Sequence, residues 1–224
     1  MAGRGPLRLL IGLRLRDPAS EEASRAARAV LEEAAGLEPS LRVPLHWNLS
    51  LRALTQSGSQ KMTDLIAGIK ARIKSCGDEI LPLGFSGAPH PLLLREELEG
   101  ELAWCRRNPW LRGFKALTGQ EPVHILPMAP DLLREQVYGA YSRQGFRSVG
   151  VALPWRQAPR LFPKRGSYRF RLGGKEERAA FFTVLLIGAR EGPAGLPWDR
   201  LAALIAALGA GGEPIFLLFD LEAA

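Results

Sequence analysis

The residues best suited to chemistry lie in the middle of this 224-residue chain, in the segment GDEILPLGFSGAPH at positions 77–90. The glycine-rich loop at positions 84–89 carries Ser86, and its backbone amides are suited to an oxyanion or a phosphate. Glu79 precedes the loop, and His46 belongs to an earlier apolar segment. We predict Glu79 and His46 as proton-transfer residues and Ser86 as a ligand-binding residue.

Structural roles are the alternative for the first two of these residues. Glu79 acts as a general acid or base only if it faces the inside of a sheet, and exposure at a strand edge fits its position equally well. His46 alternates with apolar residues in VPLHWNLSL, so it also fits a hydrogen-bonded position in a sheet. The sequence leaves both readings open.

Several common catalytic motifs are absent from the sequence. No GK[ST] follows the glycine-rich loop, so it is not a P-loop, and Ser86 lacks the G-x-S-x-G spacing. The chain has no GxGxxG, CxxC or HExxH motif. Its two cysteines, Cys76 and Cys105, are too few for a disulfide framework and are predicted to be free thiols. Serine hydrolase, nucleotide hydrolase and dinucleotide-binding functions are therefore disfavoured.

A second candidate surface is the segment from Arg156 to Lys175, which holds seven basic residues, interleaved aromatic residues and no acidic residue. Within it, Arg165, Tyr168 and Arg169 are predicted to bind a ligand, because basic side chains beside aromatic rings suit anionic sugars or stacked bases. The net charge of +7 also permits a nucleic-acid partner. The alternative is a solvated strand whose arginine stems cover apolar surface.

Apolar segments and helical repeats alternate along the chain, which indicates a parallel sheet with helical crossovers. We expect one α/β domain over residues 1–224: a seven-stranded, mostly parallel (β/α) barrel, complete or incomplete, with a small inserted hairpin near 154–176. The TQSGSQ segment at 55–60 is expected to be a flexible polar loop. The expected strands are Leu7–Leu15, Val43–Leu51, Glu79–Leu83, Val123–Leu126, Phe146–Leu153, Phe181–Ala189 and Pro214–Leu221.

Composition sets the remaining limits. With 46% hydrophobic residues, the chain can bury a large core without a metal or disulfide. The apolar run at the N-terminus is interrupted by Arg8, Arg14 and Arg16, and no segment is long enough to span a bilayer. These features predict a cytoplasmic protein without a membrane partner.

The order of these segments resembles that of the polysaccharide deacetylase-like (glycoside hydrolase/deacetylase) barrels. LIGLRLRDPAS stands where the family has a pair of aspartates, with Asp17 at the metal-binding position and Arg16 in place of the base. GDEI at 77–80 matches the family's Gly-His-Glu-Ile strand, and His90 matches one of its two following histidines. ALTGQEP and ILPMAPDLL match its LTG-x-x-P turn and the motif around Pro127.

The resemblance implies a divergent carbohydrate-active protein with altered or lost catalysis, and, if active, a hydrolase acting on a carbohydrate. Asp17 and His90 would be the ligands of a divalent metal, in an incomplete set, because such a site needs about three protein ligands. Asp17 is expected to lie beside the 84–90 loop, at the carboxyl ends of the strands. The alternative is a non-catalytic binding or interaction module that recognises an anionic ligand or nucleic acid through the basic segment.

Overall fold

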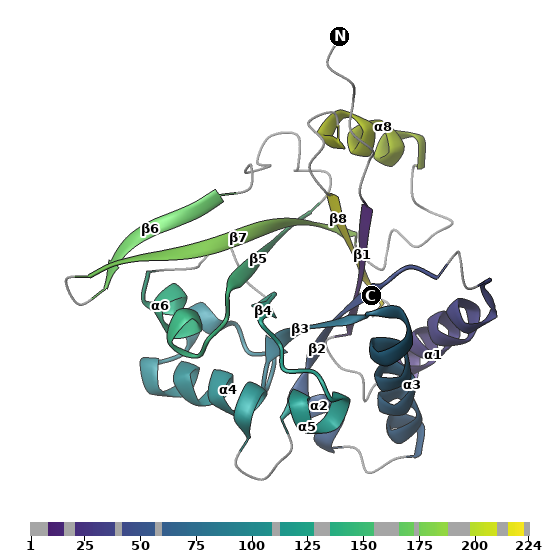
Figure 1. Ribbon diagram of the computed structural model, residues 1–224, viewed down its shortest axis with the longest axis horizontal. Helices are drawn as coiled ribbons and strands as arrows, with labels where there is room; N and C mark the ends of the chain where they lie inside the picture. The colour runs from purple at the N-terminus through teal and green to yellow at the C-terminus, as the bar shows by residue number, and fades with distance from the viewer. Residues whose placement is uncertain are drawn as a thin grey trace.

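Eight strands form one sheet in the part of the chain described by the computed structural model (Figure 1). This part comprises residues 9–15, 21–38, 42–56, 60–108, 113–127, 135–154, 166–172, 175–187, 198–209 and 215–221. The strand order is β3-β2-β1-β8-β7-β5-β4, and β6 pairs with β7 outside this path. The strands are β1 Leu9–Leu15, β2 Leu45–Ser50, β3 Glu79–Gly84, β4 His124–Ile125, β5 Ser148–Pro154, β6 Gly166–Leu172, β7 Lys175–Ile187 and β8 Ile215–Asp220.

The strand pairings are parallel along the whole path, and only the β6–β7 pair is antiparallel. The expectation of an α/β fold with a mostly parallel sheet is therefore confirmed. The pairings do not show a closed, seven-stranded barrel, because no ladder joins the edge strands β3 and β4 among the described residues. Between the described residues, a single backbone hydrogen bond crosses this gap, from Leu126 N to Pro82 O at 3.1 Å. We call this junction the β3–β4 seam.

Helices pack on the outside of the curved sheet (Figure 1). Strand residues alternate between the two faces, so one set meets the helices and the other fills the interior. Trp47 and Leu49 of β2 pack outward against α1 and α3, and Ile125 of β4 packs against α4 and α6. The helices are α1 Glu21–Gly36, α2 Leu51–Gln56, α3 Gln60–Cys76, α4 Arg95–Arg107, α5 Phe114–Thr118, α6 Glu135–Arg143 and α8 Trp198–Gly209.

An apolar cluster fills the interior of the sheet and defines its inner face. We call it the inner apolar cluster. Its central members come from strands on both sides of the seam, which shows that the sheet curves around them. The buried members are Leu81, Leu126, Ala152, Val184, Phe216 and Leu218. Of the expected strand Phe181–Ala189, Val184 and Ile187 are buried, and residues 188–189 lie outside the described part.

The expectation of a polar loop at 55–60 was wrong at both of its ends. Helix α2 includes Thr55 and Gln56, and α3 begins at Gln60. Leu51 and Leu54 explain the difference, because both are buried in the core beneath α2 and their burial outweighs the polar character of the residues that follow. Cys105 is buried and Cys76 is partly buried, and both are free, as expected. No helix in the described ranges is long and apolar enough to cross a membrane.

Candidate functional site

The carboxyl ends of β1, β2 and β3 lie side by side, as the parallel pairing of these strands requires. This edge is where parallel α/β sheets place their ligands. Arg16 and Asp17 follow β1 directly, but residues 16–20 are outside the described part. The predicted proximity of Asp17 to the 84–90 loop therefore stays a prediction.

Ser86 is held in place within the loop that follows β3. Its backbone N and its Oγ both donate to Oε1 of Glu101 on α4, at 2.7 and 2.6 Å. The same Oγ accepts a hydrogen bond from Ala88 N at 3.1 Å. The hydroxyl and amide of Ser86 thus serve to fix the loop on α4. The sequence did not single out Glu101, because fifteen positions separate it from Ser86.

His90 closes the same loop and is completely buried. Its Nδ1 lies 2.8 Å from the hydroxyl of Tyr141 on α6, and its Nε2 has no hydrogen-bond partner among the described residues. Nε2 lies against Gly84, where an added Cβ would come within 2.5 Å of it; Gly84 also has a φ of +123°, which favours glycine. Burial lowers the pKa of His90 to about 4 and raises that of Tyr141. His90 is therefore neutral at pH 7.

The described residues do not fit a metal centre at this edge. His90 is turned toward Tyr141, and no group of three or more His, Cys, Asp or Glu side chains in the described ranges gathers where a metal ion could bind. A zinc site needs about three protein ligands. The described neighbours of His90 therefore provide no support for its expected role as a metal ligand.

The burial of His90 predicts an acid-sensitive stability. An ordinary histidine pKa near 6.5 in the unfolded chain exceeds the folded value of about 4, so the unfolded state binds the extra proton. Stability from this group is complete above pH 6.5 and is lost as the pH falls toward 4, by about 3 kcal/mol. We expect urea unfolding of the wild type to show this loss, and His90→Gln to show a smaller one. Equal slopes in the two proteins would contradict a buried, neutral His90.

Three buried polar side chains lie on the inner face of the sheet at its carboxyl half. Register pairs Arg14 of β1 with Asn48 of β2 on one side and with Asp220 of β8 on the other. They are 2%, 0% and 7% exposed. Asp220 shares its face with Phe216 and Leu218 by strand alternation. We call these three residues the interior polar cluster. Arg14 and Asp220 interrupt apolar segments of the sequence, which is the local signal for this cluster, but the pattern does not show that they lie together.

Asn48 connects the interior polar cluster to the β3–β4 seam. Its Oδ1 accepts a hydrogen bond from Arg14 Nε at 2.6 Å. Its Nδ2 donates to Leu81 O of β3 at 2.7 Å and to Leu126 O beyond β4 at 2.9 Å. One side chain of β2 thus contacts both sides of the seam, which only one backbone hydrogen bond crosses directly in the described ranges.

The two predicted proton-transfer residues lie together, but at the other end of the sheet. Register pairs His46 with Glu79, the second residue of β2 with the first of β3. Five strand residues, about 16 Å, separate the level of Glu79 from that of Gly84, which contacts His90. His46 is buried, and its burial lowers its pKa. The structure therefore does not bring His46 and Glu79 into one site with His90.

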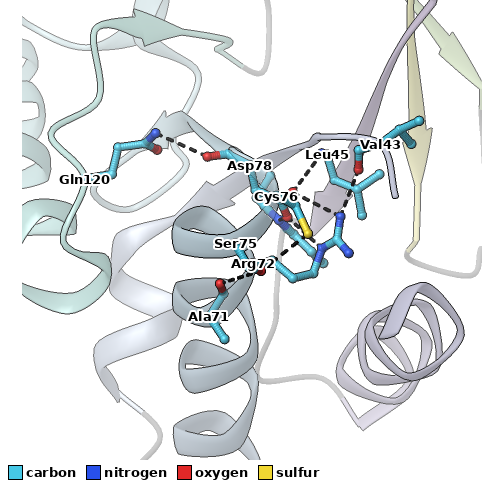
Figure 2. Close-up of polar contacts among 9 residues, drawn as sticks. Val43, Leu45, Ala71, Arg72, Ser75, Cys76, Asp78 and Gln120 are labelled. Atoms are coloured by element: carbon cyan, nitrogen blue, oxygen red, sulfur yellow. Dashed lines mark hydrogen bonds and ion pairs between the residues drawn. The ribbon is translucent and has the colours of Figure 1, made fainter. Parts of the chain in front are cut away.

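Asp78, which stands at the histidine position of the Gly-His-Glu-Ile motif, is a structural residue. It is completely buried and forms a bidentate ion pair with Arg72 of α3, Nε to Oδ2 at 2.9 Å and one terminal nitrogen to Oδ1 at 3.0 Å (Figure 2). Leu45 N and Trp47 Nε1 also donate to its carboxylate, at 3.0 and 2.7 Å. Asp78 thereby joins the end of α3 to the beginnings of β2 and β3. Gln120 Nε2 donates to its backbone oxygen.

The predicted ligand residues of the basic segment fall on and before β6. Arg165 lies in residues 155–165, outside the described part. Tyr168 and Arg169 belong to β6, where register places them opposite Ala179 and Arg178 of β7. The β6–β7 hairpin extends away from α1 and α3 (Figure 1). Its ligand-binding role stays a prediction.

Solved structures share this fold at low sequence identity. A 4-alpha-glucanotransferase from Thermococcus litoralis is 16% identical, with a TM-score of 0.64 over 96% of this chain, which spans only 33% of the transferase's length. A putative polysaccharide deacetylase from Mycobacterium smegmatis is 8% identical, with a TM-score of 0.59 over 98% of this chain and 78% of that one. The chain has a polysaccharide deacetylase-like fold. No protein-family model matches the sequence, and no curated protein matches it.

This likeness confirms the resemblance as one of fold. At such identities it transfers no residue role, so the site has to be argued from this chain's own side chains. The carboxyl edge of this fold carries the interior polar cluster, Ser86 and His90. The amino edge carries His46 and Glu79.

Proposed function

We propose that this protein is a divergent carbohydrate-active protein that binds a saccharide at the carboxyl edge of the sheet without ordinary metal-dependent deacetylation. The observation that carries the proposal is the deacetylase-like fold, which aligns over nearly the whole chain. The ligand would enter the mouth of a seven-stranded barrel closed at the β3–β4 seam.

The interior polar cluster supports a ligand site at this edge. Barrel interiors are normally filled by branched apolar side chains, and burying polar groups there is costly. Arg14, Asn48 and Asp220 depart from that pattern, and Asp220 is the last residue of its strand. Carboxylate and amide groups at a strand end are suited to hydrogen bonds with sugar hydroxyls.

Two features argue against ordinary deacetylase chemistry. Arg16 has no lone pair with which to accept a proton, so it cannot replace a carboxylate base. Its positive charge beside Asp17 also disfavours a divalent cation. His90, the other predicted ligand, is held by Tyr141. In this proposal, Asp17 lines the site together with Asp220, and the basic hairpin with Arg165, Tyr168 and Arg169 gives additional saccharide contacts.

Calorimetric titration with acetylated chito-oligosaccharides and with neutral glucan oligosaccharides tests the proposal. We expect saturable binding of a saccharide. Metal analysis of the purified protein should find well below one equivalent of zinc per chain, and an acetate assay should detect no acetate release. Asp220→Asn is expected to weaken saccharide binding at least tenfold, because it removes a charge-assisted hydrogen bond. Asp64→Asn, at an exposed position of the outer helix α3, is the matched control and should bind as the wild type does.

Two outcomes would contradict the proposal. Saturable binding of single-stranded nucleic acid with no saccharide binding would favour the alternative role of the basic segment. One tightly bound metal per chain, together with acetate release that Asp17→Ala or His90→Ala abolishes, would show that the deacetylase chemistry is intact. Melting curves of each variant separate a lost contact from lost folding.

A further inference from the structure

A group of polar side chains lines the inner face at the amino ends of four neighbouring strands. We call it the amino-end cluster: His46 of β2, Glu79 of β3, His124 of β4 and Ser148 of β5. Register pairs His46 with Glu79, and His124 with Ser148, whose Oγ lies 2.7 Å from His124 Nδ1. Strand alternation puts all four on the face of the inner apolar cluster. The carboxyl-edge site does not use them.

His46 is the most buried member and is held in its neutral form. Only 9% of the residue is exposed, and its ring meets the Phe216 ring edge-on, with 4.8 Å between the ring centroids. In the described part of the chain, its Nδ1 has no hydrogen-bond partner. Burial is the largest influence on its pKa and lowers it; the charges of Glu79 and Asp78 raise it, and His124 lowers it. Protonation would place a cation and a second N–H donor where the sheet supplies no acceptor for Nδ1.

The amino-end cluster spans the β3–β4 seam, with Glu79 and His124 on opposite sides of it. Among the described residues, one direct backbone hydrogen bond crosses this seam, whereas β1 and β2 share a ladder of five residue pairs. Strand β4 itself is two residues long. Side-chain amides provide the other described hydrogen bonds across the seam: Asn48 donates to Leu81 O and Leu126 O, and Gln120, which precedes β4, accepts from Ile80 N and donates to Asp78 O. A local opening here therefore breaks side-chain hydrogen bonds and one backbone hydrogen bond, not a full strand ladder.

We propose that the β3–β4 seam is a pH-sensitive opening, released when His46 takes up a proton in mild acid. The closed sheet disfavours a charged His46, whereas an opened seam hydrates it, so protons bind the open state preferentially and shift the equilibrium toward it. Glu79, which is paired with His46 in register, offsets part of the charge on a protonated His46, and Asp78 is already paired with Arg72. Gly12 of β1 and Phe216 of β8, which also adjoin His46, carry no charge.

Amide hydrogen exchange of the full chain tests this opening, with the Leu126 amide as the reporter because it donates the bond across the seam. After correction for intrinsic exchange, its rate should rise between pH 7.5 and 5.0 by up to about thirtyfold, the limit for a histidine with an ordinary pKa of about 6.5 in the open state. Amides in the β1–β8 ladder, such as Leu217, should not share this rise, because the opening is local.

Two variants make the test specific. His46→Gln should remove most of the acid response at Leu126. Glu79→Gln removes a negative charge that favours protonated His46 while the seam is closed. Protonation should then favour the open seam more strongly, so the Leu126 amide should exchange faster than in the wild type at pH 5.0. An acid response that is absent, that appears equally at Leu217, or that is unchanged in both variants would overturn the proposal. Saccharide binding does not enter this test, so its result is independent of the proposed function.

Discussion

Replacing Asp78 with alanine is expected to lower the free energy of unfolding by about 4 kcal/mol, because breaking a buried ion pair leaves its partner charged and unpaired. Arg72 would lose both hydrogen bonds to the carboxylate, and the donors Leu45 N and Trp47 Nε1 would lose their acceptor. These groups hold the starts of two strands against the end of α3. Urea unfolding followed by circular dichroism measures the loss.

The matched comparison separates charge from shape at this position. Asp78→Asn keeps the size of the side chain but presents an amide donor to surrounding donors, so it should also cost several kcal/mol. Asp64→Asn makes the same chemical change at an exposed position, where we expect less than about 0.5 kcal/mol. If Asp78→Asn is as mild as Asp64→Asn, the buried pair with Arg72 does not organise the amino end of the sheet.

Asn48→Leu is expected to lower the free energy of unfolding by about 3–5 kcal/mol. The substitution removes the acceptor of the buried Arg14 Nε and the donor to the carbonyls of Leu81 and Leu126. Leucine fills a similar volume, so the loss reports hydrogen bonds more than packing. The damage should concentrate at the seam, since the amide bridges Leu81 and Leu126 there. Amide exchange at Leu126 should therefore accelerate more than exchange in β1.

Asn48→Asp is the informative partner of this variant. An aspartate still accepts from Arg14 Nε but cannot donate to the carbonyls of Leu81 and Leu126. We expect it to open the seam as Asn48→Leu does while retaining the contact with Arg14. Wild-type protection at Leu126 in Asn48→Asp would show that the amide does not bridge the seam.

The sequence was most informative about elements whose pattern is local. Apolar segments placed the ends of β2 and β3 within two residues of those in the structure. The short helix α2 was missed because its support comes from the burial of Leu51 and Leu54 and not from local propensity. A local sequence pattern predicts a helix or strand correctly when the residues that form the pattern also make the tertiary contacts of that element.

The site was harder to predict because its contacts are distant in sequence. Asn48 and Leu126 are 78 positions apart, and His90 and Tyr141 are 51 apart. Alternation predicts which face a residue such as His46 occupies, but not which partner it meets there. His46 and Glu79 are paired in register on neighbouring strands, and their position near the strand starts sets them at the amino end of the sheet.

The most direct test of the central claim is a crystal structure of the protein soaked with an acetylated oligosaccharide, with anomalous scattering recorded at the zinc edge. We expect saccharide density at the carboxyl edge, in contact with Asp220 and the residues that follow β1, and His90 still bonded to Tyr141 without an anomalous peak. Saccharide bound only elsewhere, or a zinc peak coordinated by His90 and Asp17, would contradict it.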